Sequence, residues 1–308
     1  MTPVVTPAQT PAVEARNLRR RFADVEAVRG VSFEVKRGEV FGLVGPDGAG
    51  KTTVLRLLCG LLDPDEGSAS VAGLDVAQHP ADVRDRIGYM AQKFGLYGDL
   101  SVEENMDFYA DLFGLPPAEA KPLKQRLLEM TRMAPFADRP AAKLSGGMKQ
   151  KLSLMCTLLH KPEVLILDEP TNGVDPLSRR DFWLILEELV REGLTVLVAT
   201  AYLDEAERCH RVALLHEGKI IRLDSPAALR DGLPEACYAV ESQQPRSLQR
   251  QLAGTPGVAY MALSGAKLHV FLKPGADAAA LESLGLPYAR VRPTLEDVFI
   301  NEIERRTN

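Results

Sequence analysis

The chain has 308 residues, of which 45% are hydrophobic and 26% charged, as in an ordinary globular protein of one large domain or two smaller ones. Its net charge of -5 argues against binding to nucleic acid, which usually requires a basic stripe. No run approaches the roughly twenty apolar residues that cross a bilayer, and residues 1–12 lack the features of a secretory signal. We expect residues 1–12 to be a disordered tail, and any membrane role to require another subunit.

The four cysteines are widely separated, with no CxxC pair and no histidine at metal-ligand spacing. We expect buried free thiols in a reducing cytosol. These residues are Cys59, Cys156, Cys209 and Cys237.

The first third of the chain has a strand-rich pattern. Alternating apolar residues between Val13 and Val35 predict short antiparallel strands, ended by a turn at residues 36–39. A buried strand, a glycine-rich loop and a helix from Thr53 follow. The further strands expected here are 40–44, 68–71 and 87–90.

From Ser101 the pattern becomes helical, and Ser101 and Glu104 have the spacing of a capping box. Strands and helices then alternate, which is typical of a parallel sheet. We therefore expect an α/β domain over residues 13–233 with a helical subdomain inserted at about 95–160. The expected elements are helices 102–113, 123–133 and 181–191, and strands 164–167 and 195–199.

Residues 235–308 predict a separate small α+β domain. Two runs with strand periodicity are close enough to form a hairpin, and Thr294 is placed to cap a last helix. The expected elements are strand 236–240, helix 247–252, hairpin strands 258–263 and 267–272, helix 278–284 and the helix after Thr294.

Residues 45–53 read GPDGAGKTT, a complete GxxxxGK[ST] phosphate-binding loop between a strand and a helix. The glycines let the backbone wrap around an anion, and N–H groups at the helix N-terminus point at it. Lys51 would bind the β- and γ-phosphates, and the Thr52 hydroxyl would ligate Mg²⁺. The alternative is a glycine-rich turn with a chance Lys-Thr pair. The predicted nucleotide contacts are Gly45, Pro46, Asp47, Gly48, Ala49, Gly50, Lys51, Thr52 and Thr53.

Residues 164–169 read VLILDE, an apolar strand that places two carboxylates at its C-terminal end. Ligands bind at that edge of a doubly wound sheet. Asp168 is predicted to hold Mg²⁺, and Glu169 to orient or deprotonate an attacking water. The alternative is the solvated start of a loop.

Residues 144–151 read LSGGMKQK and precede an amphipathic helix. Ser145 can cap this helix, while Gly146 and Gly147 expose N–H groups at its positive end. The pattern permits a second anion site, and a flexible helix entry is the alternative.

In this order, the phosphate loop, LSGGMKQ and LDEP resemble the nucleotide-binding subunit of an ATP-binding cassette (ABC) transporter over about residues 13–232. The resemblance implies a P-loop NTPase fold with a mixed sheet, ATPase activity, and ATP and Mg²⁺ as cofactors. It also implies a second cassette, on whose nucleotide Ser145, Gly146 and Gly147 close, and a separate membrane permease. The protein would then lie peripherally on the cytoplasmic face of the plasma membrane.

Other positions match this family one by one. Phe22 resembles the aromatic residue that stacks on adenine, with an ordinary core aromatic as the alternative. Gln92 resembles the glutamine that reaches Mg²⁺ and the attacking water, and Asp175 resembles the aspartate of the loop that crosses the dimer interface. The candidates for permease contact, with burial inside this chain as the alternative, are Phe94, Leu96 and Tyr97.

One position departs from the family pattern. After the strand 195–199 the family carries a histidine that contacts the γ-phosphate, and this chain has Ala201, which can neither hydrogen-bond nor carry charge. We expect Tyr202 to point to the opposite face if the strand continues, and hydrolysis to be slow or differently organised. The histidines outside this position are His79, His160, His210, His216 and His269.

The C-terminal PTLEDVFI resembles the end of an accessory domain on exporter ATPases for drugs, antibiotics and polyketides. We expect that domain to stabilise a dimer without a ligand of its own. The leading hypothesis is a subunit that powers export of a drug-like or lipophilic substrate. The alternative is a hydrolysis-impaired regulatory half of an asymmetric pair. A soluble cassette of repair or translation is disfavoured by the single cassette and the lack of basic composition.

Overall fold

The computed structural model describes residues 10–93, 95–282 and 285–307. Most of the predicted tail, as well as Phe94, lies outside these residues. The chain divides into two compact units: residues up to 202 with 208–220, and residues 203–207 with 221–308. The predicted boundary at 233–235 falls later in the chain than this division. Within the described part of the chain, we find no helix with both the length and the apolar character to cross a bilayer.

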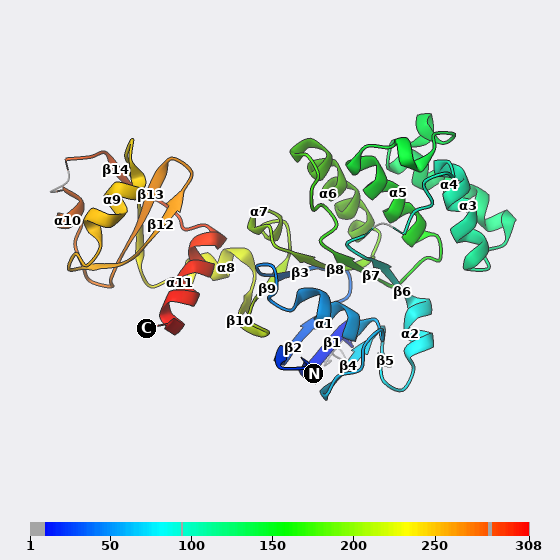
Figure 1. The fold of residues 1–308 in the computed structure, drawn as a ribbon, viewed down its shortest axis with the longest axis horizontal. Helices are drawn as coiled ribbons and strands as arrows, with labels where there is room; N and C mark the ends of the chain where they lie inside the picture. Colours follow the sequence, from blue (N-terminus) through cyan, green and yellow to red (C-terminus); the bar gives the residue numbers. More distant parts are fainter. Residues whose placement is uncertain (1–9, 94, 283–284, 308) are drawn as a thin grey trace, which may run out of the picture. The chain divides into compact units, whose positions relative to one another are not determined.

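The first unit contains an antiparallel sheet with the strand order β2-β1-β4-β5 (Figure 1). The expected alternation is confirmed, but it forms two long, bulged strands rather than several short ones. The inward-facing residues are fully buried, as at Val13, Leu18 and Val28. The strands are β1 (Val13–Phe22), β2 (Val25–Val35), β4 (Glu66–Val71) and β5 (Leu74–Asp75).

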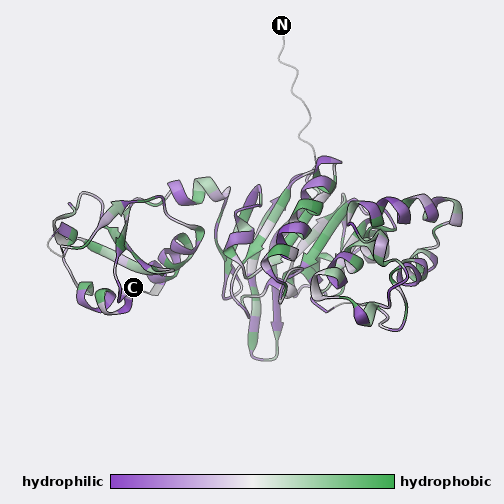
Figure 2. Ribbon diagram, turned by 90° about the horizontal axis from the view of Figure 1, so that it is seen from above, coloured by the Kyte–Doolittle hydropathy of each residue, from purple (hydrophilic) through white to green (hydrophobic). Residues whose placement is uncertain are grey.

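The second sheet of this unit has a parallel core with the strand order β9-β3-β8-β7-β6. Every residue of β3, β7 and β8 is buried, as expected for strands covered on both faces. Hydrophobic colouring in Figure 2 concentrates in such strands and on the inner faces of the helices. The parallel strands are β3 (Val40–Val44), β6 (Ile87–Met90), β7 (Val164–Asp168), β8 (Thr195–Thr200) and β9 (Arg211–His216).

Helix α1 lies between these sheets and contacts strands of both. The helical subdomain is formed mainly by α3, α4 and α5, which lie side by side in Figure 1. The predicted capping box at Ser101 is confirmed. The helices of this unit are α1 (Lys51–Leu58), α2 (Pro80–Arg86), α3 (Val102–Leu112), α4 (Pro117–Met130), α5 (Gly146–Leu158) and α6 (Pro176–Arg191), with short 3-10 turns at Ala134–Phe136 and Ala141–Lys143.

Two predicted helices have different bounds. Helix α4 covers Pro117–Met130 rather than 123–133, and α6 begins at Pro176 rather than 181. In both cases a proline occupies the first turn, where its missing N–H costs nothing. Apolar periodicity alone therefore placed both N-termini too late.

The second unit contains the antiparallel sheet β12-β13-β11-β14. The predicted hairpin is confirmed. Alternate residues face opposite sides: Leu268 and Val270 pack with α9, while His269 contacts Asp297 of α11. The elements are α7 (Leu203–Ala206), α8 (Pro226–Asp231), β11 (Ala236–Glu241), α9 (Pro245–Leu252), β12 (Val258–Ser264), β13 (Lys267–Leu272), α10 (Ala279–Glu282), β14 (Tyr288–Arg290) and α11 (Leu295–Thr307), and β10 (Lys219–Asp224) begins in the first unit and ends in the second.

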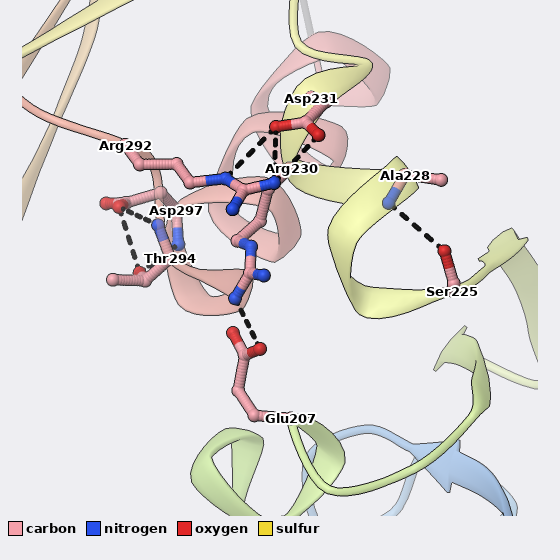
Figure 3. Close-up of polar contacts among 8 residues, drawn as sticks. All are labelled: Glu207, Ser225, Ala228, Arg230, Asp231, Arg292, Thr294 and Asp297. Atoms are coloured by element: carbon pink, nitrogen blue, oxygen red, sulfur yellow. Dashed lines mark hydrogen bonds and ion pairs between the residues drawn. The ribbon is translucent and has the colours of Figure 1, made fainter.

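Polar contacts join the short helices of this second unit (Figure 3). Asp231, at the end of α8, accepts two hydrogen bonds at 2.8 and 2.9 Å from one nitrogen of Arg292. Arg230 forms an ion pair with Glu207, which follows α7. The Ser225 hydroxyl accepts a hydrogen bond from the Ala228 N–H and caps α8. Segments far apart in the sequence are thereby tied into one unit.

Candidate functional site

The phosphate loop runs between buried β3 and α1, and two of its glycines are required by space. A Cβ atom on Gly45 would lie 2.1 Å from the Leu215 carbonyl oxygen, and one on Gly50 would lie 2.4 Å from the Ala27 oxygen. Gly50 also has φ +105°, a left-handed conformation that favours glycine. Wrapped this closely, the backbone brings its N–H groups to the N-terminus of α1, an arrangement that suits an anion.

The Lys51 side chain is buried and lies back against its own loop. Its ammonium donates to the carbonyl oxygens of Gly45 at 2.7 Å and Pro46 at 3.0 Å. It also forms an ion pair with Glu169 Oε1 at 3.1 Å. Only 4% of this side chain is exposed, and these contacts hold the ammonium against the phosphate loop. An anion bound in the loop would therefore lie close to this charge.

Asp168 ends β7 and is joined to the first turn of α1. The Thr52 hydroxyl donates to Asp168 Oδ1 at 2.9 Å, and the Tyr89 hydroxyl donates to Oδ2 at 3.3 Å. Burial raises the pKa of Asp168, and although the Thr52 hydrogen bond opposes this, the charge of Glu169 adds to it. A buried carboxylate beside a hydroxyl is the oxygen donor set that Mg²⁺ prefers, so these residues fit that ion.

Glu169 is the centre of a hydrogen-bonded cluster. Its Oε2 accepts from Gln92 Nε2 at 3.0 Å and from Asn172 Nδ2 at 3.1 Å, while Oε1 faces Lys51. The backbone of Glu169 has φ +49°, which is uncommon for a residue with a side chain. This turn aims the carboxylate at the phosphate loop. The structure thus brings together the residues predicted for catalysis: Glu169, Gln92 and Lys51.

The remaining loop residues differ in exposure. Ala49 is buried, whereas the Asp47 side chain is 92% exposed, with a carboxylate oxygen 4.0 Å from the Lys51 ammonium. Phe22, at the end of β1, is 41% exposed and lies 5.1 Å below the Arg20 guanidinium. An exposed ring is available to a flat ligand, so stacking on adenine stays a prediction.

Two other predicted segments form helix N-termini. Ser145 caps α5 by accepting from the Met148 N–H at 3.3 Å. Asp175 caps α6, and hydrogen bonds led by that from the Ser178 N–H lower its pKa. A Cβ on Gly147 would lie 2.5 Å from that of Ser178, so a glycine lets α5 and α6 pack closely. The hydrogen bonds of Ser145 and Asp175 are local.

The prediction for Tyr202 applies only if the strand continues, and that condition is not met. Strand β8 ends at Thr200, so the alternation assumed for Tyr202 does not continue. The Tyr202 hydroxyl instead donates to Asn172 Oδ1 at 3.2 Å, on the side of Glu169. Sequence reasoning missed Asn172 and Tyr89. Asn172 lies within the DEPTNGVDP segment, and that proximity to Glu169 was the available signal.

Comparisons with known proteins agree with this geometry. Residues 28–172 match a family model described as ABC transporter. The Nod factor export ATP-binding protein I of Burkholderia thailandensis is 38% identical over 293 residues, which cover 94% of this chain and 95% of that protein. The chain belongs to the ABC transporter family. Its fold, an ABC cassette of the P-loop NTPase class, is as predicted, and the chain is an ABC ATPase by family.

Further similarities extend the comparison. The probable multidrug ABC transporter ATP-binding protein YbhF of Escherichia coli is 42% identical over 297 residues, and this cassette spans only 51% of its length. A solved ATP-binding subunit of an ABC transporter is 31% identical, with a TM-score of 0.65, over 72% of this chain and 92% of that one. A dimeric bacterial ABC transporter cassette is 25% identical, with a TM-score of 0.63, over 69% of this chain and 98% of that one.

The surface of this ABC cassette has a largely apolar groove of about 330 Å³ beside the loop of Gln92. Residues of β6, α3 and α5 line it, together with Leu61 and Leu96. Tyr97 is 49% exposed, and its ring lies 4.5 Å from that of Phe108. Both described permease candidates are therefore accessible, whereas Phe94 lies outside the described residues.

The cassette's cysteines are buried and free, as predicted. One of them, Cys237, lies in the second unit with His269 and Asp297, and their potential metal-ligand atoms are within 4.8 Å of one another. However, Asp297 Oδ2 already accepts from His269 Nδ1 at 2.9 Å and from the Thr294 N–H and hydroxyl at 2.8 and 2.9 Å. Burial also raises the pKa of Cys237 to about 12, which keeps the thiol protonated. This cluster is best explained as the cap of α11.

Proposed function

We propose that the cassette binds Mg·ATP and hydrolyses it with Glu169 as general base. The phosphate loop and Lys51 would hold the phosphates. Thr52, Asp168 and Gln92 would hold Mg²⁺. The observation that supports this most directly is the convergence of Lys51, Gln92 and Asn172 on the two oxygens of Glu169. The Lys51→Ala variant should lose ATP affinity, which isothermal titration calorimetry can measure, and unchanged affinity would contradict the assignment.

We further propose that two copies of this chain enclose each ATP. The chain carries both the phosphate loop and the LSGG segment, so a second copy supplies every part of the site. Ser145, Gly146 and Gly147 of one copy would face the γ-phosphate bound by the other, with Asp175 at the interface. The exposure of Ser145 and Gly146 at the N-terminus of α5 and the dimeric state of a similar bacterial cassette support this arrangement. A sister cassette with the same segments would serve equally.

The work of hydrolysis would be delivered to a separate permease in the membrane. The groove beside Gln92 and the exposed Tyr97 would receive it, so that departure of the γ-phosphate moves the Gln92 loop and the bound permease. We propose peripheral attachment at the cytoplasmic face and export of a drug-like or lipophilic substrate, as the names of the similar multidrug and Nod factor export proteins suggest.

Co-purification tests the permease. The tagged cassette, recovered from a native membrane fraction, should retain an integral membrane protein. A Tyr97→Glu variant should lose it and keep its ATPase rate. Retention by the variant, or no membrane protein with the wild type, would contradict this docking site.

A regulatory role is the second candidate, and Ala201 is the observation that favours it. Ala201 is exposed at the bend after β8 and offers only a methyl group. Turnover would then come mostly from a partner cassette. If a missing imidazole limits hydrolysis, Ala201→His should increase the ATPase rate of the isolated protein, and no gain would count against this candidate.

A further inference from the structure

We propose that Tyr202, acting through Asn172, positions the carboxylate of Glu169 for hydrolysis. This inference rests on the proposed role of Glu169. Tyr202 follows the bend after β8, and its N–H donates to the Thr200 hydroxyl at 3.0 Å. Its own hydroxyl donates to Asn172 Oδ1 at 3.2 Å, and Asn172 Nδ2 donates to Glu169 Oε2 at 3.1 Å. Three residues from two loops thus form one chain of hydrogen bonds.

The Tyr202 hydroxyl supports the orientation of the Asn172 amide that the carboxylate of Glu169 requires. An amide has an acceptor oxygen on one side and a donor nitrogen on the other. The carboxylate of Glu169 can only accept, so it takes the nitrogen, and Tyr202 holds the amide in this orientation by donating to its oxygen. With the amide reversed, its oxygen would face a carboxylate oxygen and the hydrogen bond would become a repulsion.

These hydrogen bonds also determine which way the carboxylate of Glu169 faces. Oε2 receives both Asn172 and Gln92, at 3.1 and 3.0 Å, which leaves Oε1 directed at Lys51 at 3.1 Å. A general base must lie within hydrogen-bond reach of the proton that it removes. A carboxylate that is already oriented in the nucleotide-free protein does not have to be reoriented after ATP binds. Gln92 lies in the loop proposed to move, whereas Asn172 is held by a backbone hydrogen bond to the Glu169 carbonyl at 3.1 Å. Asn172 is therefore the donor expected to persist.

The Tyr202 ring is itself held in place. The guanidinium carbon of Arg179, from α6, lies 4.1 Å from the ring centroid, within the range of a cation–π contact. Arg179 belongs to the helix that Asp175 caps. The position of Tyr202 is thus coupled to the segment proposed to lie at the interface with the second cassette.

The test is steady-state ATP hydrolysis by Tyr202→Phe, Asn172→Ala and the double variant, with kcat and KM determined separately. The phenylalanine keeps the ring and its contact with Arg179, and equal melting temperatures would show that the fold is kept. We expect kcat to fall about fivefold to tenfold in each single variant, as for one lost hydrogen bond, with the KM for ATP within about twofold of the wild type. Since the two residues act in series, the double variant should be no slower than Asn172→Ala.

A matched control is Tyr238→Phe, which removes a tyrosine hydroxyl from β11 in the other unit and should leave kcat unchanged. A second control adds Tyr202→Phe to Glu169→Gln, where no further loss is expected. Wild-type kcat in Tyr202→Phe, or multiplied losses in the double variant, would overturn the inference. If Glu169→Gln itself turned over normally, the proposed function would fail instead, so the two failures can be told apart.

Discussion

Replacing Glu169 by glutamine tests the proposed chemistry with a minimal change of shape. The wild-type carboxylate accepts two amide N–H groups on Oε2, at 3.0 and 3.1 Å, and faces the Lys51 ammonium with Oε1 at 3.1 Å. Glutamine has one acceptor oxygen and one NH₂ group, so it can serve the amides or Lys51, but not both. We expect the nucleotide-free variant to lose about 1–3 kcal/mol of stability, the cost of leaving a buried polar group unsatisfied.

The variant should also lose most of its catalytic activity. Loss of a general base should slow hydrolysis by about a hundredfold or more, which corresponds to about 2.7 kcal/mol in the barrier. Binding should persist, because the phosphates of ATP replace Glu169 as the partner of Lys51. Phosphate release measures the rate, and calorimetry measures ATP affinity.

The control is Glu163→Gln, because Glu163 immediately precedes the same strand β7 at its opposite end. Its carboxylate is exposed and pairs with Arg37 at 3.2 Å. This variant should hydrolyse ATP like the wild type, since exposed ion pairs contribute little. A wild-type rate in Glu169→Gln would refute the reasoning, as would an equal loss in both variants.

Three further predictions follow from burial, packing and charge. Burial raises the pKa of Asp168, which means that the ionised carboxylate destabilises the nucleotide-free fold at neutral pH. Asp168→Asn removes this charge and should raise the melting temperature without nucleotide, and a lower melting temperature would contradict the reasoning. The same variant should abolish Mg²⁺-dependent hydrolysis. Gly147→Ala should cost about 1–3 kcal/mol in urea unfolding by crowding Ser178, and Ser178→Gly should recover part of that loss, whereas strict additivity would exclude crowding. Burial alone would raise the pKa of Asp297, but hydrogen bonds led by that from His269 lower it in the folded protein. The ionised carboxylate therefore stabilises the fold fully above pH 3.8, its ordinary pKa, and this stabilisation is lost as the pH falls through the lower pKa of the folded state. Asp297→Asn should weaken the pH dependence of acid unfolding, and an unchanged dependence would contradict this.

The sequence was most informative where chemistry demands particular residues at fixed spacing. The glycines at 45 and 50 have no room for a side chain, and VLILDE delivers two carboxylates to a sheet edge, so both segments could be recognised locally. Elements without such markers were missed, namely strands β5, β9, β10 and β14 and helices α2, α7 and α8. Helix starts were placed late because a first turn that begins with proline carries little apolar periodicity.

The Tyr202 contact shows why the rest of the site could not be predicted. Its direction depends on where β8 ends, because the alternation of the strand stops at Thr200. Its partner Asn172 is 30 positions earlier, so the pair exists only through the fold. Ala201, interpreted from the sequence as the loss of the family's histidine, directly precedes Tyr202. The sequence alone could not reveal the Tyr202–Asn172 contact.

The central claim is that each ATP is held between two chains, and a mixing experiment tests it directly. Lys51→Ala disables the phosphate loop, and Ser145→Arg obstructs the LSGG segment, so each purified variant should be inactive alone. A mixed pair contains one intact loop facing one intact LSGG segment. An equimolar mixture should regain about a quarter of the wild-type ATPase rate, because about half of random pairs are mixed and each has one whole site. A mixture no more active than the separate variants would contradict the account.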